Sequence, residues 1–202
     1  MIAGILGQKG CGKSTLLREF VRQNERVILL DPLGEHSVCG VVPASLPGLL
    51  AYWARTWRGK FRIVVQPHEL DPDLTPGEAL RRYGQLIRAS AYNCLIAVDE
   101  VGHLGDAWHT DPAVEWLAHY GRHHGVSLVW VARRPAEVPT VLRSQADALY
   151  VFRVADHHDL NQIRERCGDQ ADEFVDLPDY TCAVWRPGEA LKRIRVTPCS
   201  SK

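Results

Sequence analysis

The chain of 202 residues contains 24 Lys and Arg, 24 Asp and Glu, and carries a formal net charge of zero. This length is enough for one α/β domain with a hydrophobic core, and the neutral charge argues against a protein that coats nucleic acid without sequence preference. No signal peptide and no run of about 18 apolar residues is present, so we expect no intrinsic membrane segment. The six cysteines form no Cys-x-x-Cys pair, which favours reduced cytosolic thiols over a disulfide framework or a zinc site.

The first two predicted elements flank a phosphate-binding motif. Residues 1–6 are apolar and predict a buried strand, and the apolar residues of 15–22 have helical spacing. The loop between them reads GQKGCGKST and fits the P-loop pattern G-x-x-x-x-G-K-[S/T] at every fixed position. We expect all of its residues to bind nucleotide: Gly7, Gln8, Lys9, Gly10, Cys11, Gly12, Lys13, Ser14 and Thr15.

The position of this loop between a strand and a helix assigns a task to each of its parts. Backbone N–H groups at the helix N-terminus favour phosphate, and the glycines permit close backbone approach and left-handed dihedral angles. Lys13 should reach the β- and γ-phosphates, and the Ser14 hydroxyl should ligate Mg²⁺. Because the chain has no N-K-x-D guanine motif, we expect ATP with Mg²⁺ as the cofactors, and not GTP.

Strand-like and helix-like segments alternate along the rest of the chain. The predicted strands cover residues 27–31, 61–65, 94–98, 126–131 and 148–152, and the predicted helices cover 46–57, 75–91, 111–123 and 156–167. Residues 180–185 and 191–196 predict a C-terminal β-hairpin around a Pro-Gly turn. Such alternation is typical of a central, mostly parallel sheet flanked by helices. We therefore expect one α/β P-loop NTPase domain over residues 1–202.

A second motif lies at the end of the strand predicted for residues 94–98. The run Leu-Ile-Ala-Val ends in Asp99 and Glu100, which is the Walker B pattern of an apolar strand followed by an acid. Asp99 is expected to hold the Mg²⁺ shell through water. A carboxylate just past the metal can polarise an attacking water, so Glu100 is the predicted general base and favours hydrolysis over transfer to a bound acceptor.

Five further segments, in this order, resemble the HerA/FtsK-type ATPases. Residues 31–36 (DPLGEH) resemble the D-P-x-G-E-[Y/H] segment of that family, residues 121–126 (GRHHGV) its G-R-x-x-G-V, and residues 132–139 (ARRPAEVP) its T-Q-R-P-x-x-V-P. Residues 144–147 (SQAD) and 184–188 (VWRPG) resemble later segments of the same family. With the two Walker motifs, the resemblance covers nearly the whole chain.

The resemblance implies a RecA-like (ASCE) fold and a motor that moves double-stranded DNA. Members of the family form rings, so we expect a homo-oligomer and favour a hexamer. The size is similar to that of the genome-packaging ATPases of tailless, membrane-containing icosahedral viruses. This implies packaging of a viral genome into a preformed capsid, with capsid or membrane-vertex proteins as partners. The location implied is the cytoplasm of the infected cell, at a capsid vertex.

Three arginines are candidates for stabilising charge on the transferred phosphoryl group. Arg133 stands where the family usually has a Gln that senses the γ-phosphate, and an Arg cannot orient water as an amide does. We expect Arg133 to stabilise charge in cis and Arg122 to reach a neighbouring subunit as an arginine finger. For these two and for Arg134, surface salt bridging is an equal alternative. Asp31 and Glu35 either support the metal site or a subunit contact, or simply form a turn.

Other functions remain open on the sequence. A phage assembly or secretion ATPase shares the motor motifs but usually carries a transmembrane segment. A small-molecule or nucleotide kinase shares the P-loop, and it would need an acceptor site and no Glu after the Walker B Asp. An ATP-binding scaffold at a capsid vertex would bind ATP without releasing phosphate.

Overall fold

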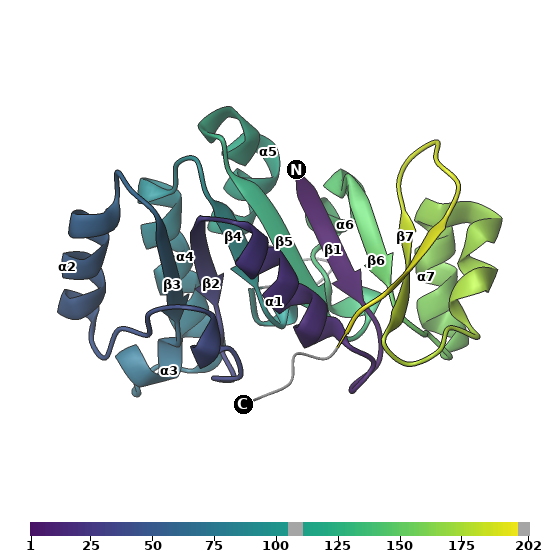
Figure 1. The fold of residues 1–202 in the computed structure, drawn as a ribbon, viewed down its shortest axis with the longest axis horizontal. Coiled ribbons are helices and arrows are strands. Elements are labelled where there is room, and N and C mark those ends of the chain that lie inside the picture. The colour runs from purple at the N-terminus through teal and green to yellow at the C-terminus, as the bar shows by residue number, and fades with distance from the viewer. Residues whose placement is uncertain (105–110, 198–202) are drawn as a thin grey trace.

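The structure, a computed structural model, describes residues 1–104 and 111–197. It contains one eight-stranded sheet with the strand order β3-β2-β4-β5-β1-β6-β7-β8. The strands β1 to β6 run parallel, and β7 and β8 are added antiparallel at one edge as the predicted hairpin (Figure 1). The strands are β1 Ile2–Leu6, β2 Arg26–Leu30, β3 Phe61–Val65, β4 Leu95–Val98, β5 Ser127–Ala132, β6 Ala148–Val151, β7 Thr181–Trp185 and β8 Lys192–Arg195.

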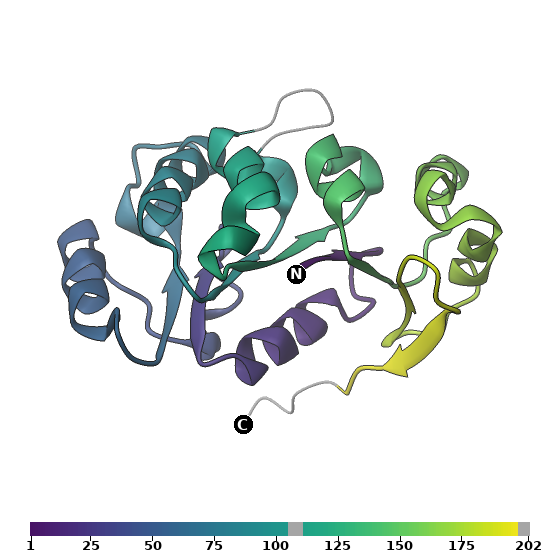
Figure 2. The same cartoon turned by 90° about the horizontal axis from the view of Figure 1, so that it is seen from above.

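Helices cover both faces of this sheet, as the alternating pattern predicts. Figure 2 shows α1 on one face and α4, α5, α6 and α7 on the other, while α2 lies beside the edge strand β3. The α-helices are α1 Lys13–Gln23, α2 Leu46–Thr56, α3 Pro67–Leu70, α4 Pro76–Ser90, α5 Pro112–Tyr120, α6 Thr140–Gln145 and α7 His157–Cys167. Short 3₁₀ helices are η1 Ser37–Cys39, η2 Val101–Leu104, η3 Gly121–His124, η4 Pro135–Glu137 and η5 Gly168–Phe174.

Alternating side chains divide the core into two layers, one on each face of the sheet. In β1, Ala3 and Ile5 join the layer under α1, whereas Ile2 and Leu6 join the layer under the other helices. Between them Gly4 faces the indole of Trp130 on β5, which would lie 2.2 Å from any Cβ at that position. The strand is therefore buried on both faces, as a central parallel strand should be.

Two predicted helices differ from the structure at one end. The helix α1 begins at Lys13, two residues before the predicted start, because Gly12 adopts a left-handed φ of 114° and Lys13 and Ser14 form the first turn. The helix α5 ends at Tyr120, and residues 121–124 continue as the 3₁₀ helix η3. The predicted capping box of α4 is present, since the Thr75 side chain accepts from the Glu78 N–H and Glu78 accepts from the Thr75 N–H.

None of the helices within residues 1–104 and 111–197 combines the length and hydrophobicity needed to span a bilayer. The five cysteines in these residues are free: Cys11, Cys39, Cys94, Cys167 and Cys182. Cys199 lies outside the described residues.

Burial lowers the chemical reactivity of three of these thiols. Burial raises the pKa of Cys94 to about 11 and the pKa values of Cys167 and Cys182 to about 12. At neutral pH, a thiol pKa three units above the ordinary value leaves about 10³-fold less reactive thiolate. We expect iodoacetamide to modify half-buried Cys39 in the native protein and to reach Cys94, Cys167 and Cys182 only after unfolding, as measured by peptide mass spectrometry. Rapid modification of Cys182 in the native protein would contradict this packing.

Candidate active site

The P-loop leaves the carboxyl end of β1 and leads directly into α1, at the lower edge of the sheet in Figure 1. Gly7, Gly10 and Gly12 have φ values of 147°, 81° and 114°, all in the left-handed region. At Gly7 a Cβ would also lie 2.6 Å from the side chain of Phe152, so this position excludes any larger residue. The loop thus has the backbone conformation that turns N–H groups toward an anion.

One contact from a neighbouring segment and one contact within the loop hold the P-loop in shape. The N–H of Tyr180, just before β7, donates to the carbonyl of Cys11 (3.0 Å), and the Cys11 thiol donates to the carbonyl of Gln8 (2.9 Å). Burial, the largest influence, raises the pKa of the Cys11 thiol despite the charge of Lys13. Cys11 is therefore a packing residue, and its backbone is the part available to phosphate.

The predicted phosphate-binding side chains lie in the first turn of α1. Lys13 is only 7% exposed, and its Nζ donates to the carbonyl of Gln8 (2.8 Å). Ser14 and Thr15 are half-buried beside it. The Lys13 ammonium is thus held within the loop by a single carbonyl, a bond that a polyphosphate can replace with charge-assisted bonds.

The Walker B acids lie at the same edge of the sheet, because β1, β2 and β4 are parallel. Asp99 directly follows β4, and its N–H donates to the carbonyl of Leu30 (3.0 Å), at the end of the adjacent β2. Its side chain is nearly buried. The structure therefore brings the predicted Mg²⁺ ligand Asp99 to the edge that carries the P-loop.

The segment 31–36 forms a turn that supports Asp99. The Asp31 carboxylate accepts from the N–H groups of Glu35 (3.0 Å) and His36 (2.9 Å) and from Nε2 of Gln66 (3.0 Å). The Nε2 of His36 lies 3.0 Å from Oδ2 of Asp99, and both side chains are buried. Of the open alternatives for Asp31, the structure contains the turn, and this turn brings the imidazole of His36 to Asp99, the predicted Mg²⁺ ligand.

His36 is the residue that the sequence reasoning did not assign. Burial lowers its pKa, but the hydrogen bond to Asp99 and the charges of Asp99 and Asp31 outweigh it and raise the pKa to about 9. The one available signal was the family-like segment DPLGEH, in which His36 is the last residue.

The predicted base Glu100 follows Asp99 in a left-handed conformation, with φ 52°. Its Oε1 accepts a hydrogen bond from Nε of Arg133 (2.7 Å), at the end of β5. Arg133 thus lies at the predicted edge, where its guanidinium contacts the predicted base. The hydrogen bond to Glu100, the largest influence, raises the pKa of Arg133.

The other two arginines form salt bridges. Arg134 pairs with Asp159 (3.1 Å) and, more loosely, with Asp156 (3.8 Å). Arg122 pairs with Asp147 (3.1 Å), whose carboxylate also accepts from the N–H of Ile2, the first residue of β1. The P-loop follows the last residue of this five-residue strand. Arg122 therefore lies roughly 16 Å from the P-loop, at the amino ends of the parallel strands. It cannot reach its own chain's P-loop.

No protein-family model matches this chain, and no curated protein matches its sequence. Solved structures do match it. The genome packaging NTPase B204 of Sulfolobus turreted icosahedral virus 2, in complex with AMPPCP, aligns with a TM-score of 0.75 at 20% identity over 97% of both chains. The bacterial conjugative coupling protein TrwB aligns at 0.68 and 11% identity over 97% of this chain and 84% of that one. VirB4 of Thermoanaerobacter pseudethanolicus aligns at 0.65 and 14% identity, over 98% and 90%.

The chain has the P-loop NTPase fold of these structures. At these sequence identities the similarity establishes the fold alone, and the activity has to be inferred from the residues of the site. The P-loop and Asp99 lie at the carboxyl ends of the parallel strands, where open α/β sheets bind ligands.

The oxygen atoms at this edge suit Mg²⁺. The Ser14 hydroxyl and the Asp99 carboxylate are the hard donors that this ion prefers, and Asp31 is already engaged by its turn. Ligand atoms of Asp31, His36 and Asp99 lie within 4.8 Å of one another. Both oxygens of Asp31 and Oδ2 of Asp99 already accept hydrogen bonds, so we assign no second metal ion to this group.

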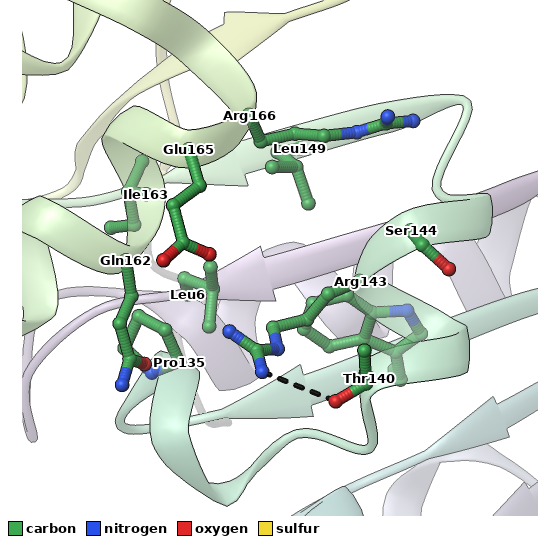
Figure 3. A pocket seen from close by; sticks show the side chains of 11 residues that line it. Leu6, Pro135, Thr140, Arg143, Ser144, Leu149, Gln162, Ile163, Glu165 and Arg166 are labelled. Atoms are coloured by element: carbon green, nitrogen blue, oxygen red, sulfur yellow. Dashed lines mark hydrogen bonds between the residues drawn. The ribbon is translucent and has the colours of Figure 1, made fainter. Parts of the chain in front are cut away.

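A separate cavity of about 240 Å³ lies on the face of the sheet opposite α1, between α6 and α7 (Figure 3). Leu6 and Leu149 line it from the sheet, Arg143 from α6 and Arg166 from α7. None of the predicted nucleotide-binding residues lines it. The cavity is therefore not part of the candidate active site.

The buried Lys13 yields a direct prediction for nucleotide binding. Replacing it with alanine removes the one side-chain cation of the P-loop that is held inside the loop, and we expect the affinity for ATP to fall at least about tenfold, in line with about 1.5–3 kcal/mol for a charge-assisted bond. Isothermal titration calorimetry with a non-hydrolysable ATP analogue measures this. Lys9→Ala is the matched control, because the Lys9 side chain is exposed and the substitution keeps the backbone N–H through which this residue would bind phosphate. Equal losses in both variants would contradict the assignment.

Proposed function

We propose that this protein is an ATP-hydrolysing motor that translocates double-stranded DNA, and that it packages a viral genome into a preformed capsid. The observation that carries the proposal is a P-loop with Asp99 and Glu100 at one edge of a HerA/FtsK-type sheet. The full-length similarity to B204, whose chain is covered to 97%, supports the packaging role.

The proposed hydrolysis assigns one role to each residue of this edge. The P-loop N–H groups and Lys13 bind the phosphates, and Ser14 and Asp99 hold Mg²⁺. When bound, Mg²⁺ neutralises charge on the β- and γ-phosphates. Glu100 takes a proton from the attacking water as the water oxygen bonds to the γ-phosphorus. The bond between the γ-phosphorus and the β–γ bridging oxygen breaks. The products are ADP and inorganic phosphate.

Arg133 acts on this reaction through Glu100 in the proposal. Its hydrogen bond of 2.7 Å orients the carboxylate, which is 16% exposed and lacks another ion pair among the described residues. The family's Gln at this position would act on the γ-phosphate, so the Arg shifts the contact from the nucleotide to the base. As ATP enters, the guanidinium is close enough to this edge to stabilise charge in cis as well.

Arg122 is proposed to act on a neighbouring subunit. It is two-thirds exposed at the edge opposite its own P-loop, so it is available to another copy. This arrangement requires a ring, for which we favour a hexamer, located in the infected cell at a capsid vertex and in contact with capsid or membrane-vertex proteins. A second candidate, a conjugation or secretion motor, is favoured by the fold similarity to TrwB and VirB4.

Translocation itself is tested by strand displacement. A triplex-forming oligonucleotide bound to linear double-stranded DNA should be released by the protein only when ATP is present, and Lys13→Ala should fail to release it. Triplex release that is equal with ATP and with a non-hydrolysable analogue would contradict an ATP-driven motor. Separation of the duplex into single strands, without displacement of the third strand, would favour the conjugation alternative.

A further inference from the structure

The contact between His36 and Asp99 joins the turn 31–36 to the metal-site acid. The two side chains are almost completely buried, and His36 Nε2 lies 3.0 Å from Asp99 Oδ2. No other group in residues 1–104 or 111–197 donates a hydrogen bond to this carboxylate. The position of the Asp99 side chain therefore depends on His36 more than on any other side chain.

His36 is itself held in place by a network that does not involve Asp99. Its N–H donates to Asp31 Oδ2 (2.9 Å), and Gln66 Nε2 donates to the same oxygen (3.0 Å) and to Ser37 Oγ (2.9 Å). The Asp31 N–H in turn donates to the carbonyl of Val65, at the end of β3. The backbone of His36 is thus fixed at the ends of β2 and β3, and its side chain is fully buried.

The same turn is attached to the helix that carries the P-loop. Nη2 of Arg18, one turn into α1, donates to the carbonyl of Glu35 (2.9 Å), next to His36. The turn therefore connects the phosphate-binding helix with the acid at the end of β4. A carboxylate that binds a metal depends on such outer hydrogen bonds for its orientation.

We propose that His36 is the positioning residue for Asp99, and that its Nε2–H holds one carboxylate oxygen so that the other is free for Mg²⁺. The inference rests on the proposed ATPase function. A purely structural buried pair would contribute to stability alone. A positioning role also predicts a loss of Mg²⁺ affinity, of about 10–100-fold when such an outer contact is removed.

The test compares two substitutions that differ in where they place an amide nitrogen. In His36→Gln the side-chain nitrogen reaches close to the position of Nε2 and still donates to Asp99, whereas in His36→Asn it is too short to do so. For each variant, calorimetry measures the affinity for a non-hydrolysable ATP analogue in excess Mg²⁺ and in EDTA. The Mg²⁺ concentration for half-maximal ATP hydrolysis is measured in parallel.

We expect His36→Asn to lose about tenfold or more of the affinity gain that Mg²⁺ provides, with its affinity in EDTA unchanged, and His36→Gln to keep most of the gain. A wild-type Mg²⁺ gain in folded His36→Asn would overturn the inference. Equal losses in both folded variants would overturn it too, since a neutral donor in the same place would have failed. Should His36→Asn not fold, His36→Phe fills the ring volume without the donor, and the same comparison applies.

These measurements separate the inference from the function on which it rests. A wild-type protein that binds the analogue with a Mg²⁺ gain and hydrolyses no ATP would contradict the proposed function and leave the His36 comparison intact. A wild-type protein whose analogue affinity ignores Mg²⁺ would overturn the inference, because Asp99 would then hold no metal.

Discussion

Replacing Glu100 with glutamine should lower the turnover of ATP by about 10²–10⁴-fold, the range of a lost general base. Glutamine keeps the size of the side chain and still accepts a hydrogen bond from Arg133, but it cannot take the proton of the attacking water. Steady-state phosphate release measures the loss. Calorimetry with a non-hydrolysable ATP analogue should give a near wild-type affinity, because the P-loop is untouched.

The control for this experiment is Glu137→Gln. It removes a carboxylate of η4 that acts on the charge of Arg133 but has no part in the proposed chemistry. Its turnover should stay close to that of the wild type. If Glu100→Gln hydrolyses ATP as fast as the wild type, Glu100 is not the base, and its contact with Arg133 is structural only.

The Arg122→Ala substitution should lower turnover by about 10³–10⁵-fold, the range for an arginine finger, without weakening ATP binding. The reason is geometric: Arg122 lies with Asp147 at the edge of the sheet opposite its own P-loop, so it can stabilise phosphoryl charge only in another subunit. The measurement is phosphate release at a protein concentration that permits assembly, with native mass spectrometry to confirm that the variant still assembles. Arg186→Ala is the matched control, because Arg186 is a half-buried arginine that lines the same surface hollow as Arg122 and Asp147.

Mixing two inactive variants tests the same point from the other side. Arg122→Ala retains the nucleotide site, and Lys13→Ala retains Arg122, so a mixed ring should contain some complete sites. We expect activity in the mixture that exceeds the sum of the two separate activities. A mixture with no gain, although both variants co-assemble, would show that Arg122 does not act between subunits.

Most of the fold was predictable because its signals are local. Each central strand is a short apolar run ending at a Gly, Asp or loop, and the P-loop sequence demands a strand before it and a helix after it. The capping box at Thr75 and Glu78 marks the start of α4 in the sequence itself. The short α6 carries no such signal: its N-cap is Pro139 without a side-chain cap, and packing against α5 and β1 holds it in place.

The candidate site was predictable where one motif contains the whole feature. The P-loop is one contiguous segment, and the two Walker B acids are another. Each follows a strand of the parallel sheet, so both are expected at the carboxyl ends of the strands. The partners of the acids were not predictable, because His36 and Arg133 reach Asp99 and Glu100 across 63 and 33 residues of sequence. Salt bridging was an open alternative for Arg122, Arg133 and Arg134, and all three form salt bridges in the structure.

The central claim is that the active unit is an assembly that acts on DNA, and phosphate release measured against protein concentration tests it most directly. The wild-type protein is measured with and without long double-stranded DNA. The account predicts turnover that rises more steeply than in proportion to protein and that increases when DNA is added. Turnover strictly proportional to protein concentration and unchanged by DNA would contradict it, and a search for a small-molecule phosphoryl acceptor would then follow.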